Sequence, residues 1–116
     1  MRHRIGAIAR FARIGIALGI LSLSPNLAAQ NAPSKFTVTM AQMRYGALPA
    51  NVKVGDTIVW VNRDTVLHTV TARDRSFDLR IPPRKQAAMV VKKAGKFPFY
   101  CITHPAMRGT LSVAAR

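Results

Sequence analysis

The short segment "CITHPAM", residues 101–107, carries three side chains that can bind a soft metal ion. Cys101 offers a thiolate, His104 an imidazole and Met107 a thioether, and a second imidazole, His68, lies farther back in the chain. Sulfur from a thiolate and a thioether, combined with imidazole nitrogen, is a donor set that suits copper in both of its oxidation states. We therefore treat these four residues as candidate ligands of one ion.

Other metals fit this set less well. Structural zinc prefers four thiolate or imidazole donors, and a thioether is a poor ligand for it. Iron–sulfur clusters need more cysteines than one, and attachment of c-type haem needs a second cysteine where position 103 is threonine. Each residue also has a purely structural interpretation, with Cys101 and Met107 as packing residues and His68 as a hydrogen-bonded residue at the rim of the core. Taken together, their joint placement favours a metal site.

The first 29 residues have the features of a secretory signal peptide. The apolar run "IGIALGILSL" (14–23) is too short to span a bilayer, and Pro25 and the small residues Ala28 and Ala29 follow it. The residues before the run include several basic and no acidic side chains: Arg2, His3, Arg4, Arg10 and Arg13. We expect cleavage after Ala29 and export to the periplasm, with an uncleaved membrane anchor as the alternative, and no stable membrane insertion after cleavage.

Residues 30–116 then form one small domain, whose core is modest for its size. Cys101 has no partner for an internal disulfide, and an unpaired thiol in an oxidising compartment is a liability that a metal bond would remove. We expect this domain to be a monomer.

The domain is strongly basic. The chain has 18 Lys and Arg residues and four acidic residues; four of the basic ones lie in the leader, which leaves a net charge of +10. The basic residues are scattered, as in "ARDRSFDLRIPPRK" (72–85), and an exported domain rarely meets nucleic acid. We therefore expect an acidic protein partner and no nucleic acid.

Period-two alternation of apolar residues predicts an all-β domain. Strands are expected in six segments separated by Gly and Pro turns: 35–40, 52–62 (two strands about a Gly-Asp turn), 68–72, 86–93, 95–101 and 109–115. This spacing indicates a β-sandwich of seven to eight strands. Residues 73–85 are expected to be a loop, with a short helix left open, and Trp60 is expected to be a core residue of a central strand.

The same alternation places the candidate ligands. Phe97, Phe99 and Cys101 share one face of their strand, so the thiol should point where the aromatic core residues point. His68 shares its face with Val70, which also favours the interior. The loop after Cys101 carries the other two candidates, and the four together would join two strands of the sandwich.

Three stretches resemble the amicyanin-like cupredoxins of the plastocyanin/azurin family of blue copper proteins. "CITHPAMRG" (101–109) is similar to their C-x-x-H-x-x-M ligand loop, and "VWVNRDTVLHTV" (59–70) to the segment carrying their remote histidine. "VKVGDTIVWVN" (52–62) is similar to a stretch shared by plastocyanin-like members. The resemblance extends from about Phe36 to Val113.

The resemblance implies a cupredoxin-type Greek-key β-sandwich that binds one copper ion, cycling between Cu(I) and Cu(II). It assigns His68, Cys101 and His104 as ligands, Met107 as a weak axial ligand, and Asn62 as a hydrogen-bonding residue close to them. A further expectation is an apolar partner patch around the exposed ligand, and its members are Leu67, Pro105 and Ala106.

The chain departs from this family at three places. Ile102 and Thr103 replace Thr-Pro in the ligand loop, and Ala106 replaces a larger aromatic residue. Pro98 lies within the strand that leads to Cys101, which predicts an edge strand or a bulge.

The expected function is transfer of single electrons between redox partners by a periplasmic blue copper protein that is not an enzyme. The partner would be an acidic redox protein, a dehydrogenase or a cytochrome c. One alternative is a copper carrier or storage protein without redox turnover, to which Met40, Met43 and Met89 could contribute. Another is a basic exported domain that binds anionic surfaces without a metal, which explains the charge and not the loop.

Overall fold

The computed structural model describes residues 12–22 and 31–116 of the chain. Residues 12–22 form neither helix nor strand, and the expected cleavage point after Ala29 lies outside the described residues. No helix within the described ranges is long and apolar enough to cross a membrane.

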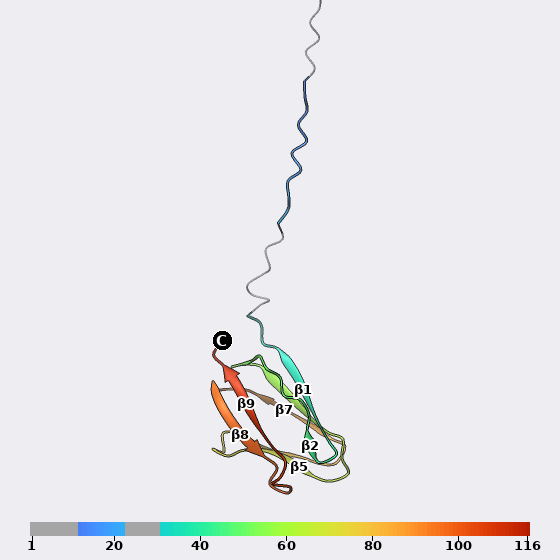
Figure 1. Ribbon diagram of the computed structural model, residues 1–116, viewed down its shortest axis with the longest axis vertical. Coiled ribbons are helices and arrows are strands. Elements are labelled where there is room, and N and C mark those ends of the chain that lie inside the picture. The colour runs from blue at the N-terminus through green and yellow to red at the C-terminus, as the bar shows by residue number, and fades with distance from the viewer. Residues whose placement is uncertain (1–11, 23–30) are drawn as a thin grey trace, which may run out of the picture.

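Residues 31–116 form a β-sandwich of two facing sheets (Figure 1). Nine strands are present in this part of the chain, two of them only two residues long. Their bounds are β1 Lys35–Ala41, β2 Arg44–Tyr45, β3 Val52–Lys53, β4 Thr57–Asn62, β5 His68–Ala72, β6 Asp78–Ile81, β7 Gln86–Val90, β8 Gly95–Tyr100 and β9 Arg108–Ala114. The all-β class and the sandwich architecture predicted from the alternation are confirmed.

The four-stranded sheet has the order β2-β1-β4-β7 and the five-stranded sheet the order β3-β9-β8-β5-β6. β1 pairs with β4 in parallel, so Val38 lies beside Trp60, and β4 pairs with β7 in antiparallel fashion. The strands on either side of the Gly-Asp turn, β3 and β4, belong to different sheets, so this turn carries the chain from one layer to the other. β4 is central, as its two apolar faces predict.

The core lies between the sheets and is built on three aromatic side chains. Trp60 and Phe99 are fully buried, with ring centroids 5.4 Å apart in an edge-to-face arrangement, and Tyr45 packs 4.9 Å from Phe99. Aromatic pairs prefer this geometry, which adds about 0.5–1.5 kcal/mol per pair beyond area burial. The prediction that Trp60 is a core residue is confirmed.

Gly109 makes room for this aromatic cluster. It lies opposite Phe99 in the β8–β9 ladder, and a Cβ atom there would lie 2.7 Å from the Phe99 ring. A side chain at this position would displace Phe99, two residues before Cys101.

Two expectations for this region are corrected. Residues 73–85 contain strand β6, where a loop with an optional helix was expected. The prediction that Pro98 marks an edge strand or a bulge is wrong, because β8 lies between β9 and β5 and its register with β9 is continuous. β5 pairs with β8 only as far as Ala72 opposite Phe99, and the carbonyl of Pro98 accepts the N–H of Arg73 beyond that point. The missing N–H of proline therefore falls where the β5 ladder has ended.

Candidate metal centre

The candidate ligands come from two places that the sheet brings together. His68 is the first residue of β5, and Cys101 directly follows β8. Because β5 and β8 are antiparallel neighbours, the start of one lies beside the end of the other. His104 and Met107 lie on the loop from Cys101 to the start of β9.

Three donor atoms converge at this end of the sandwich. The Sγ atom of Cys101 is 3.9 Å from Nδ1 of His68 and 3.7 Å from Nδ1 of His104, and the three residues' donor atoms all lie within 4.8 Å of one another. Two ligands that each lie about 2.0–2.3 Å from one ion at trigonal angles are about 3.7 Å apart. The observed separations therefore fit a His₂Cys group around a single copper ion.

The thiol of Cys101 is buried and surrounded by hydrogen-bonding groups. The N–H of Thr69 donates to Sγ at 3.2 Å, and the hydroxyl of Thr103 lies 3.2 Å from Sγ. Burial raises the pKa of Cys101, but the hydrogen bonds from Thr103, Thr69 and the two imidazoles outweigh it and lower the pKa to about 6. At neutral pH the site therefore holds a thiolate, the form that binds metal.

Met107 closes the ligand loop through its backbone. Its N–H donates to the carbonyl of His104 at 2.8 Å, and its carbonyl accepts the N–H of Cys101 at 3.0 Å. Its side chain is buried, 4% exposed, whereas the flanking residues Ala106 and Arg108 are exposed. The loop thus directs the thioether into the protein, as an axial ligand would require.

Asn62 stabilises the loop that leads to His68 through hydrogen bonds. It is buried, and its Nδ2 atom donates to the carbonyls of Val66 (2.8 Å), Ile81 (3.0 Å) and Pro82 (3.2 Å). Its Oδ1 atom accepts the N–H of Asp64 at 2.9 Å. All of these contacts go to backbone groups, so Asn62 acts on the site by fixing the 62–67 loop against the end of β6.

Asp64 is a site residue that the sequence analysis missed. Its Oδ2 atom lies 2.7 Å from Nε2 of His68, and its carboxylate also accepts the N–H groups of Gln42 (2.8 Å) and Met43 (3.0 Å). The hydrogen bond with His68 is the main reason that the pKa of Asp64 is lowered. A carboxylate four residues before a candidate histidine is a detectable signal, because metal-binding histidines often donate their second ring nitrogen to a carboxylate.

Thr69 is the second missed residue, and all of its polar groups are engaged. Besides its N–H to Cys101, its carbonyl accepts the hydroxyl of Tyr45 (2.6 Å), and its Oγ1 atom accepts the N–H of Ile102 (2.8 Å). The hydroxyl of Thr71 lies 3.0 Å from the same Oγ1 atom and 2.7 Å from Oδ1 of Asp78. The alternation of apolar residues places Thr69 on the outer face of β5, so it does not predict that Thr69 contacts the ligand loop.

The three residues of the expected partner patch lie on the two loops that carry His68 and His104. Pro105 and Ala106 are exposed, Leu67 is half-buried, and the Oγ1 atom of Thr103 lies 3.1 Å from the carbonyl oxygen of Leu67, so the two loops are in contact. His104 is only half-buried, whereas His68 is fully buried. His104 is thus the candidate ligand that reaches the surface.

The fold and this donor set define a β-sandwich protein with a site for a single copper ion. The profile of the cupredoxin-like domain matches residues 13–113, so the chain belongs to the cupredoxin family. The amicyanin of Paracoccus denitrificans is 33% identical over 100 residues, which cover 81% of this chain and 76% of that protein. The amicyanin of Paracoccus versutus is 29% identical over 126 residues, covering 97% of this chain and 95% of that protein.

Solved amicyanin structures share the fold. A Cu(I) form of one amicyanin variant superposes with a TM-score of 0.60 at 31% identity, covering 75% of this chain and 89% of that one. An oxidised form of another variant gives a TM-score of 0.61 at 30% identity with the same coverage. The family identified from the ligand loop is therefore confirmed, and the chain is a blue copper electron carrier by homology.

Proposed function

We propose that this protein is a periplasmic carrier of single electrons in which His68, Cys101 and His104 bind copper and Met107 is a weak axial ligand. The observation that carries the proposal is the convergence of one thiolate and two imidazole nitrogens within 4.8 Å, two of the three residues being fully buried. When bound, copper supplies the one-electron couple and its thiolate absorption.

The residues of this chain hold the donors in a fixed arrangement. Asp64 orients the ring of His68, the N–H of Thr69 stabilises negative charge on the thiolate, and the hydroxyl of Thr103 contacts both Sγ of Cys101 and Nδ1 of His104 at 3.2 and 3.1 Å. Donors fixed in this way move little when the charge at the site changes, so little reorganisation opposes electron transfer.

The methionines favour an electron carrier over a copper store. Met40 is fully buried in the core and Met89 is packed against it, so both have structural explanations. Met43 is 41% exposed in the turn between β1 and β2, and a single exposed thioether is a weak basis for storage. We therefore retain the redox role, and the protein performs no substrate chemistry.

Docking is proposed to occur through the patch of Leu67, Pro105 and Ala106 above His104. A flat uncharged surface lets a partner approach the exposed ligand without desolvating charge. The net charge of +10 outside the leader supports an acidic partner, a dehydrogenase or a cytochrome c, whose association slows as salt rises. The basic leader with its short apolar run supports export, and amino-terminal sequencing of the secreted protein tests cleavage after Ala29.

Visible spectroscopy and voltammetry of the copper-loaded protein test this function. We expect an intense blue band and a reversible one-electron wave, and Cys101→Ser should abolish the band. Met107→Leu should alter the spectrum and potential, whereas Met89→Leu, a matched change away from the ligand loop, should not. A protein that binds copper with weak colour and no reversible wave would instead be a carrier or store, and an equally blue Cys101→Ser variant would refute the ligand assignment.

A further inference from the structure

A hollow lies along one side of the sandwich, apart from the candidate metal centre. It is bordered by β6 and β7, which are the edge strands of the five-stranded and four-stranded sheets. The cavity has a volume of about 430 Å³, within the range of 300–1,000 Å³ typical of small-molecule sites.

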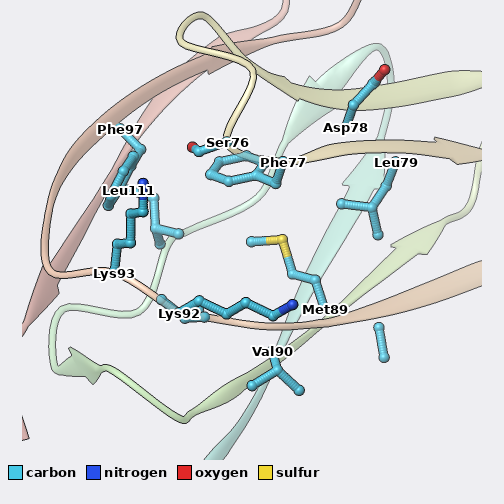
Figure 2. A pocket seen from close by; sticks show the side chains of 12 residues that line it. Ser76, Phe77, Asp78, Leu79, Met89, Val90, Lys92, Lys93, Phe97 and Leu111 are labelled. Carbon is cyan, nitrogen blue, oxygen red and sulfur yellow. The ribbon is translucent and has the colours of Figure 1, made fainter.

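The walls of this hollow are apolar. Phe77 and Leu79 enter from the β6 side and Met89 from β7, and Figure 2 shows the Phe77 ring and the Met89 thioether directed into the space. Phe97 and Leu111 form its inner wall as part of the buried core, with the Phe77 and Phe97 rings 6.2 Å apart. These side chains form an apolar surface that is continuous with the core and that the apolar part of a ligand could contact.

The apolar side chains of the hollow are incompletely covered. Ala88, which also lines the hollow, is exposed. Phe77, Leu79 and Met89 are only half-buried although they pack against the core. Covering these three side chains would remove apolar surface from water, which favours binding of an apolar group.

Two lysines border the opening. Lys92 and Lys93 follow β7 after Val91, both are exposed, and Figure 2 shows their side chains beside the hollow, extending in different directions. Among the residues that the structure describes, neither lysine forms a salt bridge. Two ammonium groups beside an apolar surface favour an anionic head group.

Two acidic residues, Asp78 and Asp74, lie near the hollow, and both accept hydrogen bonds from neighbouring residues. Figure 2 shows the carboxylate of Asp78 pointing away from the apolar centre; it accepts the hydroxyl of Thr71 at 2.7 Å and pairs with Arg75 at 3.7 Å. Asp74, in the preceding loop, accepts the N–H of Ser76 at 2.9 Å, and the charge of Lys93 contributes to lowering its pKa. Asp74 thus partly offsets Lys93, and the net charge at the opening remains positive because Lys92 has no such partner among the described residues.

We propose that this hollow binds a monoanionic amphiphile, a carboxylate or sulfonate attached to an apolar body. The apolar body lies between Phe77, Leu79 and Met89, and the head group lies beside Lys92 and Lys93. The proposal depends on the cavity and its charges and is independent of the copper site.

Octanoate and its neutral counterpart 1-octanol test this proposal against the copper-loaded protein in its reduced form. Amide chemical shifts in ¹⁵N NMR should change saturably with octanoate at residues 76–79 and 88–93. The double variant Lys92→Gln, Lys93→Gln should weaken octanoate binding about threefold to tenfold, since two exposed charge contacts are lost. 1-Octanol should bind the unaltered protein more weakly by a similar factor.

The matched control, Arg44→Gln with Lys53→Gln, removes two exposed basic residues on β2 and β3, the edge strands opposite to β7 and β6, and so changes the net charge equally. This control should retain binding within about twofold, because distant exposed charges are screened by salt. Leu79→Ser, with its fold verified by thermal unfolding, should weaken both ligands. The proposal is overturned by equal weakening in the two double variants, by equal affinity for 1-octanol, by shifts spread over the basic surface, or by no saturation.

Discussion

Asp64 acts on the metal centre through the ring nitrogen of His68 that faces away from Cys101. The same carboxylate accepts the N–H groups of Gln42 and Met43, both in the left-handed region with φ of 53° and 60°. A non-glycine residue adopts this region only when its surroundings favour it. The carboxylate therefore connects the turn between β1 and β2 to the ring of His68, a candidate ligand.

Replacing Asp64 with Asn should preserve shape while removing the negative charge. We expect the reduction potential to rise by about 40 mV, because roughly 1 kcal/mol of interaction favouring the more positive Cu(II) state is lost. Cyclic voltammetry measures this shift. Asp74→Asn removes the same charge from an exposed loop and should leave the potential nearly unchanged; equal shifts in the two variants would mean that only overall charge matters.

Thr103 is the residue that replaces proline in the ligand loop, and its hydroxyl contacts the thiol. In the metal-free protein, thiolate absorbance should rise with a midpoint near pH 6, because hydrogen bonds hold the pKa of Cys101 at about 6. Thr103→Val should move the midpoint upward by about one pH unit, since a hydrogen bond to a charged group is lost. Thr65→Val, in the neighbouring loop, is the control, and an unmoved midpoint in Thr103→Val would exclude the hydroxyl as a donor.

At the level of elements, local alternation predicted the strands that carry the ligands. Phe97, Phe99 and Cys101 face the interior as their spacing requires, and His68 and Val70 do the same on β5. Burial on one face selects a period of two in each strand separately, so this information is present in the local sequence. The C-x-x-H-x-x-M spacing likewise identified the loop because its donors are close in sequence.

The features that were missed depend on pairing between distant segments. β6 has only four residues next to two prolines, and it exists because Val70 and Leu79 pair across the β5–β6 ladder. Pro98 is tolerated inside the sheet because β5 ends at Ala72. Neither fact can be read from the residues of one strand, since each depends on where a neighbour stops.

The outer face of β5 shows the same limitation, and it supports a prediction. Thr69 and Thr71 are fully buried where alternation expects exposure, and the hydroxyl of Thr71 connects Thr69 to Asp78. Thr71→Val keeps the shape and removes this connection, so the free energy of unfolding should fall by about 1–2 kcal/mol. Urea denaturation of the copper-loaded protein measures it.

The spectrum of Thr71→Val should remain unchanged, because the N–H of Thr69 still donates to Cys101. Thr110→Val, at an exposed position on β9, should leave both stability and spectrum as they were. A Thr71→Val protein as stable as the unaltered one would show that water replaces the lost hydroxyl.

At the scale of the whole molecule, a buried carboxylate connects several segments at the end of the sandwich opposite the candidate metal centre. Asp56 precedes β4, whose other end leads through Asn62 to the loop of His68. Its carboxylate accepts the N–H groups of Ser34 and Lys53, each at 2.8 Å, and pairs with Arg116. Three segments that are distant in the chain therefore meet at one charged group.

Burial raises the pKa of Asp56, but these hydrogen bonds and Arg116 outweigh it, so the pKa is lowered in the folded state. The stability it contributes is fully present above the unfolded-state pKa of about 3.9 and is lost as pH falls through the lower folded-state value. Asp56→Asn should therefore cost about 2–4 kcal/mol at neutral pH and less in acid. Thermal unfolding between pH 7 and pH 3 checks this, and a penalty independent of pH would contradict it.

In the proposed function, electron transfer to a partner depends on the charge and the apolar patch together. Basic residues distributed over the domain would attract an acidic partner from a distance, and the patch of Leu67, Pro105 and Ala106 would set how closely it approaches His104. A carboxylate on this patch must be desolvated when the partner docks.

We therefore expect Leu67→Asp and Ala106→Asp to slow transfer to an acidic c-type cytochrome about tenfold, with colour and potential nearly unchanged. Ala94→Asp makes the same change in charge before the start of β8, at the end of the strand away from Cys101, and should slow transfer less than twofold. Stopped-flow rates and visible spectra of the three variants provide the comparison. Equal slowing in all three variants would mean that long-range charge alone controls the rate. Unchanged rates in the two patch variants would mean that the electron leaves the protein at another surface.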